Sequence, residues 1–389
     1  MAKEFIGNLV FPERCVFGVL TCAKTQIASI NIMDDRPHKA ADLILPGFIN
    51  SHFHGLGASN VNDDKSSLLE IMKFSPKTGV TGICPTLAAA PIEMTNVFLT
   101  NVKELSQLSD GGAKMLGSHL EGPFIAEDHK GGMDAEYLRN PTVKLAQQLI
   151  DRADGTLKLM TLSPELPGAM EVVKLLKKNH VVVSVGHTGA SPAVLEQAVD
   201  CGVSLVCHLF DTFDERSVEC GVSQYSLADA VLVEDRVFVE LILDGIHVPK
   251  GLLELARRAA GVGRLVGITD SMVGTGLPDH DYPMADGRIF RLVNGDVCRL
   301  KSGRREIVGS CLTMDQAFRN LVMKFGFSYS EASQLLSTNP ARVLQLENET
   351  GRLEKGLRAD ITILSPENYI VKECLVAGKT QYLARGGEK

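Results

Sequence analysis

The sequence predicts an α/β fold, a (β/α)8 TIM-type barrel plus a small β-sandwich domain formed by both chain termini. Three observations predict it: apolar runs alternate with helical patterns through the middle, polar residues follow the ends of these runs, and both termini resemble short strands without helices between them. With 389 residues, 44% of them hydrophobic and 22% charged, the chain can build a large core and is not compositionally disordered.

Eight segments in the middle of the chain are predicted strands, and their near-continuous apolar character is typical of parallel strands covered on both faces. They span residues 43–50, 82–85, 115–120, 157–161, 181–185, 205–207, 237–243 and 265–269. Helical patterns occupy residues 66–78, 91–106, 142–154, 169–179, 192–201, 252–261 and 313–325. A doubly wound sheet would show the same alternation.

The polar residues favour the barrel over the open sheet. Almost every predicted strand is followed by a side chain that binds metals or moves protons, as in Asn50-Ser-His-Phe-His54, Gly186-His187 and Thr269-Asp270. In a closed barrel the carboxyl ends of all strands converge on one mouth, whereas an open sheet would spread these residues along a line.

The two ends of the chain predict a second, smaller domain. Strand-like pieces lie near residues 6–11, 15–20 and 26–32, and a meander follows from about residue 346, with a hairpin turn at Ala377-Gly-Lys379. We expect residues 1–44 and 346–389 to form this β-domain and residues 45–345 to form the barrel. Within the latter, residues 288–308 are β-rich, and Asn294-Gly295 is a strong hairpin signal.

Charge and composition exclude several classes of protein. The net charge of −7 comes without any basic run, so neither nucleic acid nor an anionic membrane is an expected partner. No apolar run approaches the ~20 residues of a membrane span. The first residues lack the apolar stretch of a secretory signal, and the nine cysteines are scattered without a Cys-x-x-Cys pair. We therefore expect a cytoplasmic protein with reduced thiols.

Five residues at strand ends are candidate metal ligands. His52 and His54 are two apart on an extended segment, so both imidazoles can face one ion. Glu121 follows one strand, and His187 and His208 follow two others. Each alone reads equally well as a loop or core residue; together they match the nitrogen and oxygen ligand sets of hydrolytic metal centres.

Asp270 ends the last strong strand, where it could take a proton from a metal-bound water and pass it to a leaving amine. The alternative is a carboxylate that caps the next turn. His247 could bind a polar or anionic substrate group, or be an ordinary loop histidine. The sequence holds no P-loop, dinucleotide fingerprint, nucleophile elbow or His-Glu-x-x-His motif, so ATP, dinucleotide and serine-hydrolase functions lose support.

Motifs in a fixed order along nearly the whole chain give it a resemblance to a known family. It resembles the amidohydrolase superfamily and, within it, the N-acetylglucosamine-6-phosphate deacetylases. The motifs include Pro46-Gly-Phe-Ile-Asn-Ser-His-Phe-His-Gly55, His119-Leu-Glu-Gly-Pro-Phe124, Lys130-Gly-Gly-Met-Asp134, Val185-Gly-His-Thr-Gly-Ala190, Asp244-Gly-Ile-His-Val248 and Asn339-Pro-Ala-Arg342.

The resemblance implies roles for the candidate residues. It makes Glu121, His187 and His208 the ligands of one divalent metal, while His52 and His54 can hold a second. It makes Asp270 the general acid and base. It also implies that His247 contacts the substrate and that the protein forms a homodimer.

The substrate side departs from the family pattern. Met133 stands where the family has a histidine that contacts the sugar, and Asp211-Thr212 stand where it has Asn-Ala. The arginine that meets the sugar phosphate is missing from the matching run, Val218-Glu-Cys-Gly221, and nearby Arg216 is its candidate replacement. We name Met133, Asp211, Thr212 and Arg216 as candidate substrate contacts.

The sequence therefore predicts a metal-dependent deacetylase of an amino sugar, acting on N-acetylglucosamine 6-phosphate or a similar substrate. One or two divalent ions are expected per chain, Zn²⁺ first and Fe²⁺, Mn²⁺ or Co²⁺ as alternatives. A different N-acyl substrate, such as another acetylhexosamine or an acyl amino acid, is the first rival. A relative without catalytic activity that serves in binding is the second.

Overall fold

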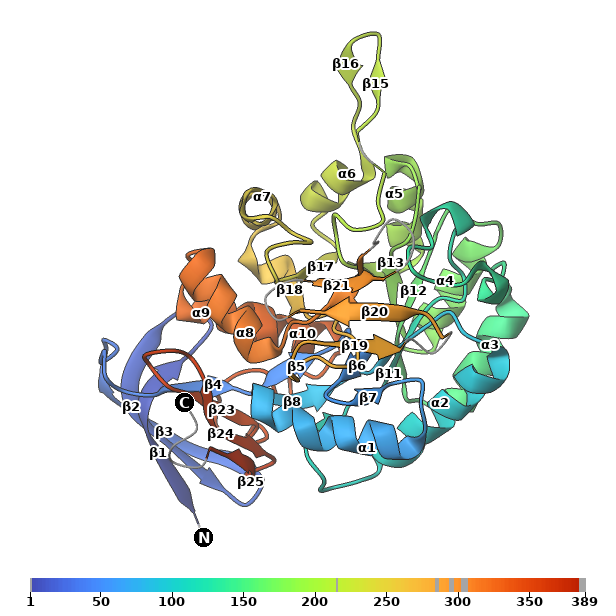
Figure 1. Cartoon of the computed structure of the whole chain (residues 1–389). Helices are drawn as coiled ribbons and strands as arrows, with labels where there is room; N and C mark the ends of the chain where they lie inside the picture. Colours follow the sequence, from blue (N-terminus) through green and yellow to red (C-terminus); the bar gives the residue numbers. More distant parts are fainter. Residues whose placement is uncertain (1, 215, 284–286, 294–296, 302–306, 385–389) are drawn as a thin grey trace.

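The computed structural model describes residues 2–214, 216–283, 287–293, 297–301 and 307–384 (Figure 1). No helix among these residues has the length and apolar character needed to cross a membrane. Two bodies are visible, a ring of strands wrapped by helices and a β-domain in which the blue N-terminal strands lie beside the red C-terminal ones.

The ring is a parallel barrel. One sheet has the order β18-β17-β14-β13-β12-β11-β9, and a second sheet, β10-β8-β5, continues it. Backbone hydrogen bonds close the ring between its first and last strands: Asp270 N–H donates to the His52 carbonyl at 3.0 Å, and His54 N–H donates to the Ser271 carbonyl at 2.8 Å. Its strands are β5 (Phe48–Asn50), β8 (Val80–Ile83), β9 (Thr86–Ala88), β10 (Lys114–Met115), β11 (Ser118–Glu121), β12 (Leu157–Leu162), β13 (Val182–Val185), β14 (Val203–Val206), β17 (Phe238–Ile242) and β18 (Leu265–Ile268). The predicted fold class is confirmed.

Amphipathic helices surround the barrel because their apolar residues recur every three to four positions. In α3, for example, Ala146, Leu149 and Ala153 are buried, and the Thr142 side chain caps the first turn. The helices are α1 (Lys65–Phe74), α2 (Ile92–Ser106), α3 (Val143–Ala153), α4 (Ala169–Lys178), α5 (Pro192–Cys201), α6 (Leu227–Val233), α7 (Lys250–Ala260), α8 (Met314–Arg319), α9 (Tyr329–Ser333) and α10 (Asn339–Val343). Helix α6 was not predicted from the sequence.

The terminal strands form one seven-stranded sheet, β25-β24-β23-β4-β1-β2-β3. Its own core joins both ends of the chain, for example Leu9 and Leu20 with Ile361 and Leu375. The predicted hairpin turn is present, since Val376 pairs with Lys379 and both Ala377 (φ 48°) and Gly378 (φ 77°) are left-handed. We propose 1–44 and 346–389 as the bounds of this domain. The strands are β1 (Lys3–Val10), β2 (Cys15–Ala23), β3 (Gln26–Asp34), β4 (Leu43–Pro46), β23 (Ile361–Leu364), β24 (Val371–Val376) and β25 (Lys379–Leu383).

Two insertions leave the barrel. The first is an antiparallel sheet after β18, with strands β19 (His280–Pro283), β20 (Ile289–Leu292), β21 (Val297–Leu300) and β22 (Ile307–Ser310). The sequence predicted a β-rich segment here, and its Asn294-Gly295 turn lies outside the described residues. The second is an unpredicted hairpin, β15 (Val218–Glu219) with β16 (Val222–Ser223), that projects from the body at the top of Figure 1.

Short elements complete the chain. They are the pair β6 (Gly55–Leu56) and β7 (Ser59–Asn60), the 3₁₀ helices Ser75–Thr78, Glu127–His129, Ala135–Tyr137 and Val262–Arg264, and the π-helical turns Asn320–Lys324 and Gln334–Thr338.

Candidate metal centre

The five predicted ligands meet at the carboxyl ends of the barrel strands. The Glu121 side chain lies between the four imidazoles: its Oε1 is 3.0 Å from His187 Nε2, 3.0 Å from His208 Nε2 and 3.5 Å from His52 Nε2. Its Oε2 is 3.3 Å from His54 Nε2. All five are buried except His54, whose side chain is 17% exposed. Residues more than 150 positions apart thus share one small volume.

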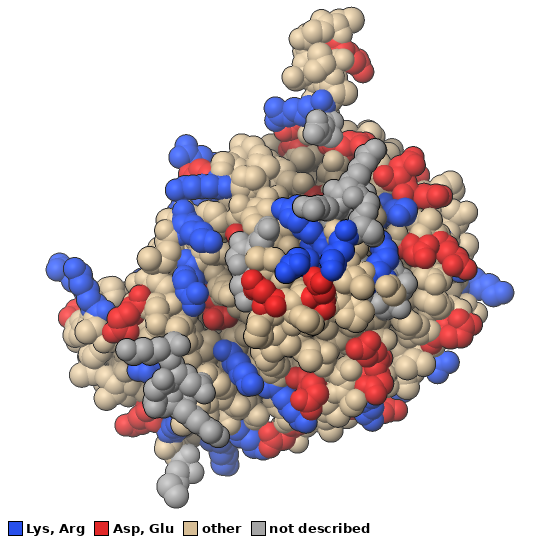
Figure 2. Space-filling view, in the orientation of Figure 1, with Lys and Arg blue, Asp and Glu red and all other residues tan. Residues whose placement is uncertain are grey.

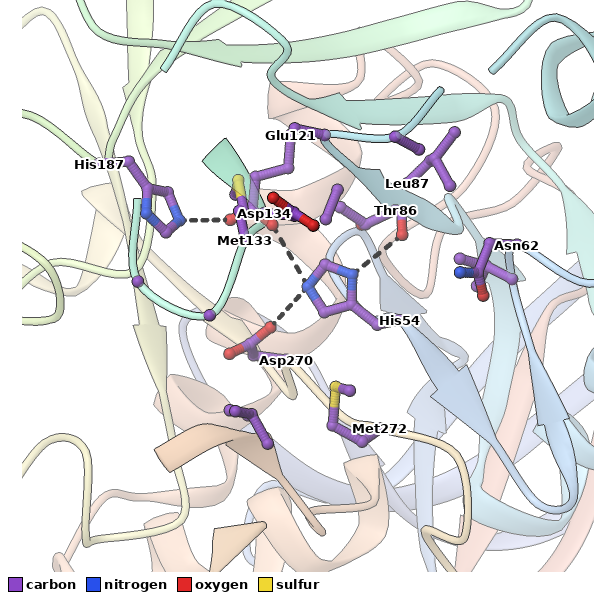
Figure 3. Close-up of a pocket in the computed structure, with 18 of the residues that line it drawn as sticks. His54, Asn62, Thr86, Leu87, Glu121, Met133, Asp134, His187, Asp270 and Met272 are labelled. Atoms are coloured by element: carbon purple, nitrogen blue, oxygen red, sulfur yellow. Dashed lines mark hydrogen bonds and ion pairs between the residues drawn. The ribbon is translucent and has the colours of Figure 1, made fainter. Parts of the chain in front are cut away.

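Hydrogen bonds fix the orientation of two of these rings. His54 Nδ1 lies 3.0 Å from the Thr86 carbonyl and His187 Nδ1 lies 2.8 Å from the His129 carbonyl. A carbonyl only accepts, so Nδ1 must carry the proton in both rings. In the neutral imidazoles Nε2 therefore presents a lone pair, and both lone pairs face carboxylate oxygens (Figure 3). A cation between the nitrogen lone pairs and the carboxylate oxygens would replace their repulsion with attraction.

The other two rings support the same conclusion. His52 Nδ1 is 3.2 Å from Oε2 of the fully buried Glu240, and its Nε2, which points at Glu121, has no hydrogen-bond partner. His208 Nε2 lies 3.2 Å from His187 Nε2, a contact between two nitrogens that a shared metal ion explains. A carboxylate that holds the outer nitrogen of a ligating histidine is a common support of metal sites.

The donor set therefore fits a divalent metal. Nitrogen and carboxylate oxygen donors suit Zn²⁺ and related ions. Two overlapping groups of donor atoms lie close enough to bind: His52, Glu121, Cys207 and His208, and His52, His54 and Asp270. The Cys207 thiol, 3.8 Å from Glu121 Oε1, is a neighbour of the site that sequence reasoning did not identify.

Asp270 contacts the same nitrogen of His54 that Glu121 contacts. Its Oδ1 is 3.0 Å from His54 Nε2 (Figure 3). The same oxygen is 3.6 Å from His52 Nε2. Burial raises the pKa of Asp270, but the hydrogen bond and charge of His54 outweigh it and hold the pKa below its usual value. Burial lowers the pKa of His54, and its bonds to Asp270 and Glu121 reverse this and raise it to about 9, so Nε2 binds either a proton or, in its place, a metal ion. Asp270 is therefore ionised at neutral pH and ready to accept a proton.

Backbone strain accompanies three of the site residues. His187, His208 and Asp270 each lie two residues after the end of a barrel strand and have positive φ angles of 52°, 21° and 48°. Residues other than glycine rarely adopt this left-handed region, and such outliers cluster at functional sites. Here the turn directs each side chain inward to the barrel mouth.

A pocket of about 250 Å³ opens on this cluster, a size that suits a small molecule. Met133, Asp211 and Thr212 line it, as predicted for substrate contacts. Gly131 brings the loop before Met133 against the site: a Cβ there would lie 3.4 Å from His187 Cε1.

The other two candidate substrate contacts lie elsewhere among the described residues. His247 is buried beside Asp244, with Nδ1 2.5 Å from Oδ2 and Nε2 without a partner, but it does not line the pocket. Arg216 pairs with Asp229 at the base of the projecting hairpin, with its side chain 57% exposed. Within one chain, Arg216 does not reach the pocket wall.

Besides Cys207, three residues of this region were not identified from the sequence. Glu240 could have been identified from the sequence, because a carboxylate inside the apolar strand Phe238–Ile242 needs a buried partner. His119 is buried behind His52, and burial holds its pKa well below the usual value, so the ring is neutral. Arg288 lines the pocket from the β19–β22 insertion, and no local pattern predicts that location.

Comparison with known proteins agrees with this geometry. The model of the amidohydrolase family matches residues 43–387. An N-acetylgalactosamine-6-phosphate deacetylase of Escherichia coli O157:H7 is 31% identical over 83% of this chain and 84% of its own length. An N-acetylglucosamine-6-phosphate deacetylase of Bacillus subtilis is 31% identical over 85% and 83% of the two chains.

Solved structures extend the similarity to the fold. An N-acetyl-D-glucosamine-6-phosphate deacetylase mutant from Mycobacterium smegmatis, in complex with N-acetyl-D-glucosamine-6-phosphate, superposes with a TM-score of 0.86 at 26% identity over 98% of this chain and 99% of its own. The deacetylase from Thermotoga maritima gives a TM-score of 0.87 at 25% identity over 99% and 100%. The chain belongs to the amidohydrolase family, and its chemistry is the metal-dependent hydrolysis of an amide.

Proposed function

We propose that this protein removes the acetyl group from an N-acetylhexosamine 6-phosphate and releases acetate and the free amine. The names of the two curated relatives support this substrate class. The observation that carries the proposal is the convergence of four imidazole Nε2 atoms on Glu121, with Asp270 3.0 Å from one of them at the pocket.

The residues of the site have different roles in the proposed reaction. When bound, a divalent cation supplies Lewis acidity, which makes water more acidic and polarises an amide carbonyl. Glu121, His187 and His208 would hold one ion, and His52 and His54 would hold a second. We propose Zn²⁺ as the native metal, because imidazole and carboxylate ligands suit it, with Fe²⁺, Mn²⁺ or Co²⁺ as substitutes.

Asp270 is the proposed general base and acid. Its ionised carboxylate accepts the proton of the attacking water and then donates it to the departing amine nitrogen. The Thr86 carbonyl fixes the His54 ring, whose Nε2 lies 3.0 Å from the Asp270 carboxylate. Met133 offers no proton donor to the amide, so polarisation of the carbonyl depends on the ions rather than on this side chain.

Deacetylation assays test the proposal directly. The metal-supplemented protein should release acetate from N-acetylglucosamine 6-phosphate, and the galactosamine relative makes N-acetylgalactosamine 6-phosphate the second substrate to compare. Cleavage of other N-acyl compounds but of neither sugar phosphate would contradict the substrate assignment. Metal binding without hydrolysis of any amide would contradict the activity.

We also propose that the protein is a cytoplasmic homodimer. The projecting hairpin carries Val218 and Val222, which are 64% and 63% exposed, and apolar side chains on such an extension favour burial against a second copy. Light scattering of the wild type and of a Val218→Ser/Val222→Ser variant tests this. A dimer that dissociates more readily in the variant supports the proposal, and a monomeric wild type contradicts it.

A further inference from the structure

Arg288 lies where the β19–β22 insertion covers the pocket. In β20 the side chains alternate: Phe290 and Leu292 are fully buried, whereas Ile289 is 46% exposed and Arg291 is exposed. Arg288 directly precedes β20, two residues before the buried Phe290, and is itself half-buried. It lines the same pocket as His54 and Asp270.

The guanidinium of Arg288 is held against the loop that carries Met133. Its Nη2 donates a hydrogen bond to the Gly132 carbonyl at 2.6 Å. In the same loop, a Cβ on Gly131 would lie 3.3 Å from Thr212 Cγ2 and 3.4 Å from His187 Cε1. Arg288 is therefore bonded to the loop that packs against the metal ligand His187 and against Thr212.

Arg288 also has a charge that the pocket otherwise lacks. Among the described residues that line the pocket, the acidic ones are Glu121, Asp134, Asp211 and Asp270, and the only Lys or Arg is Arg288. Basic side chains gather over this sheet in the middle of Figure 2, with acidic ones beside them. Arginine presents a planar fork of donors that matches phosphate oxygens.

We propose that Arg288 binds the phosphate of the sugar substrate where the β19–β22 insertion lines the pocket. This inference rests on the proposed deacetylation of a hexosamine 6-phosphate. It assigns to the β19–β22 insertion the anion-binding role for which Arg216, paired with Asp229, is not available within the chain.

Kinetics with Arg288→Met on phosphorylated and unphosphorylated N-acetylglucosamine test the assignment. KM for the 6-phosphate should rise by about 10- to 150-fold, the range for losing charge-assisted hydrogen bonds, while KM and kcat for the free sugar change by less than about twofold. Arg288→Lys should restore part of the affinity because it keeps the charge. Arg291→Met is the matched control, since Arg291 has the same charge three residues further along the same insertion and an exposed side chain paired with Asp281.

Because Arg288 also bonds to the Gly132 carbonyl, a purely structural role is the competing explanation. Equal losses on both sugars, or no change on either, would overturn the proposal. Calorimetry of glucose 6-phosphate binding and of glucose binding tests the role of Arg288 independently of the proposed activity, because neither ligand has an amide to cleave. A wild type that deacetylates neither sugar contradicts the proposed function. Arg288→Met must still weaken glucose 6-phosphate binding for the inference to stand.

Discussion

The two walls of the pocket are built in different ways. The metal-side wall consists of residues placed directly after barrel strands, where His187, His208 and Asp270 share left-handed backbone turns and an interlocked set of short contacts. The substrate-side wall consists of the loop with Met133, the Asp211-Thr212 segment and the β19–β22 insertion with Arg288. In the proposed function the chemistry is therefore tied to the barrel scaffold, while the specificity depends on loops and on the β19–β22 insertion.

The largest effect is expected from a change in the metal-side wall, at Asp270. Asp270→Asn should keep the bound metal and lower kcat by about 10²- to 10⁴-fold, because it removes the proton acceptor but no ligand of the first ion. Metal analysis and turnover are measured on the same sample. A variant that loses metal in proportion to its activity would show that Asp270 acts as a ligand instead.

Removing the His-x-His pair tests whether the second group of donors binds its own ion. The double change His52→Ala/His54→Ala should lower the metal content from two ions per chain to one and reduce kcat, since the carbonyl then loses one source of polarisation. Elemental analysis with parallel assays measures both. One ion per active wild-type chain, with activity that survives the double change, would exclude the second ion.

A change at Glu240 tests whether metal binding depends on a buried residue behind the metal-side wall. Glu240→Gln keeps the size of the side chain but removes the charge that orients His52 Nδ1, so metal affinity should fall by about 10- to 100-fold. Competition with a chelator measures the affinity. Glu127→Gln, an exposed change on the nearby 3₁₀ helix, is the control and should leave affinity unchanged. Equal affinities for wild type and Glu240→Gln would limit Glu240 to a packing role.

The smallest effect is expected at the base of the projecting hairpin, outside both pocket walls. The Arg216 hydrogen bond lowers the pKa of Asp229 to about 2 from 3.8, so the pair stabilises the fold above the unfolded pKa and loses this contribution as the pH falls through the folded one. Arg216→Ala should cost less than about 1 kcal/mol at pH 7, because the pair is solvent-exposed. Urea unfolding at pH 5 and pH 3 should show the difference from wild type shrinking in acid. A difference that grows in acid would contradict this sign.

The contrast between the walls also explains what the sequence could predict. His52, His54, Glu121, His187 and His208 follow apolar runs, and barrel geometry alone brings the ends of such runs together. No such pattern surrounds Arg288, because the segment inserted after β18 reaches the pocket only through tertiary packing. Arg216 was favoured by its closeness in sequence to the expected position, but its bond to Asp229 in α6, an unpredicted helix, decides its placement.

Crystallography of the purified protein, with anomalous scattering to identify the ion, tests the central claim most directly. The account predicts a divalent ion about 2.0–2.2 Å from a Glu121 carboxylate oxygen and from Nε2 of both His187 and His208. An active protein that retains no divalent ion, or one whose ion lies away from these three side chains, would contradict it.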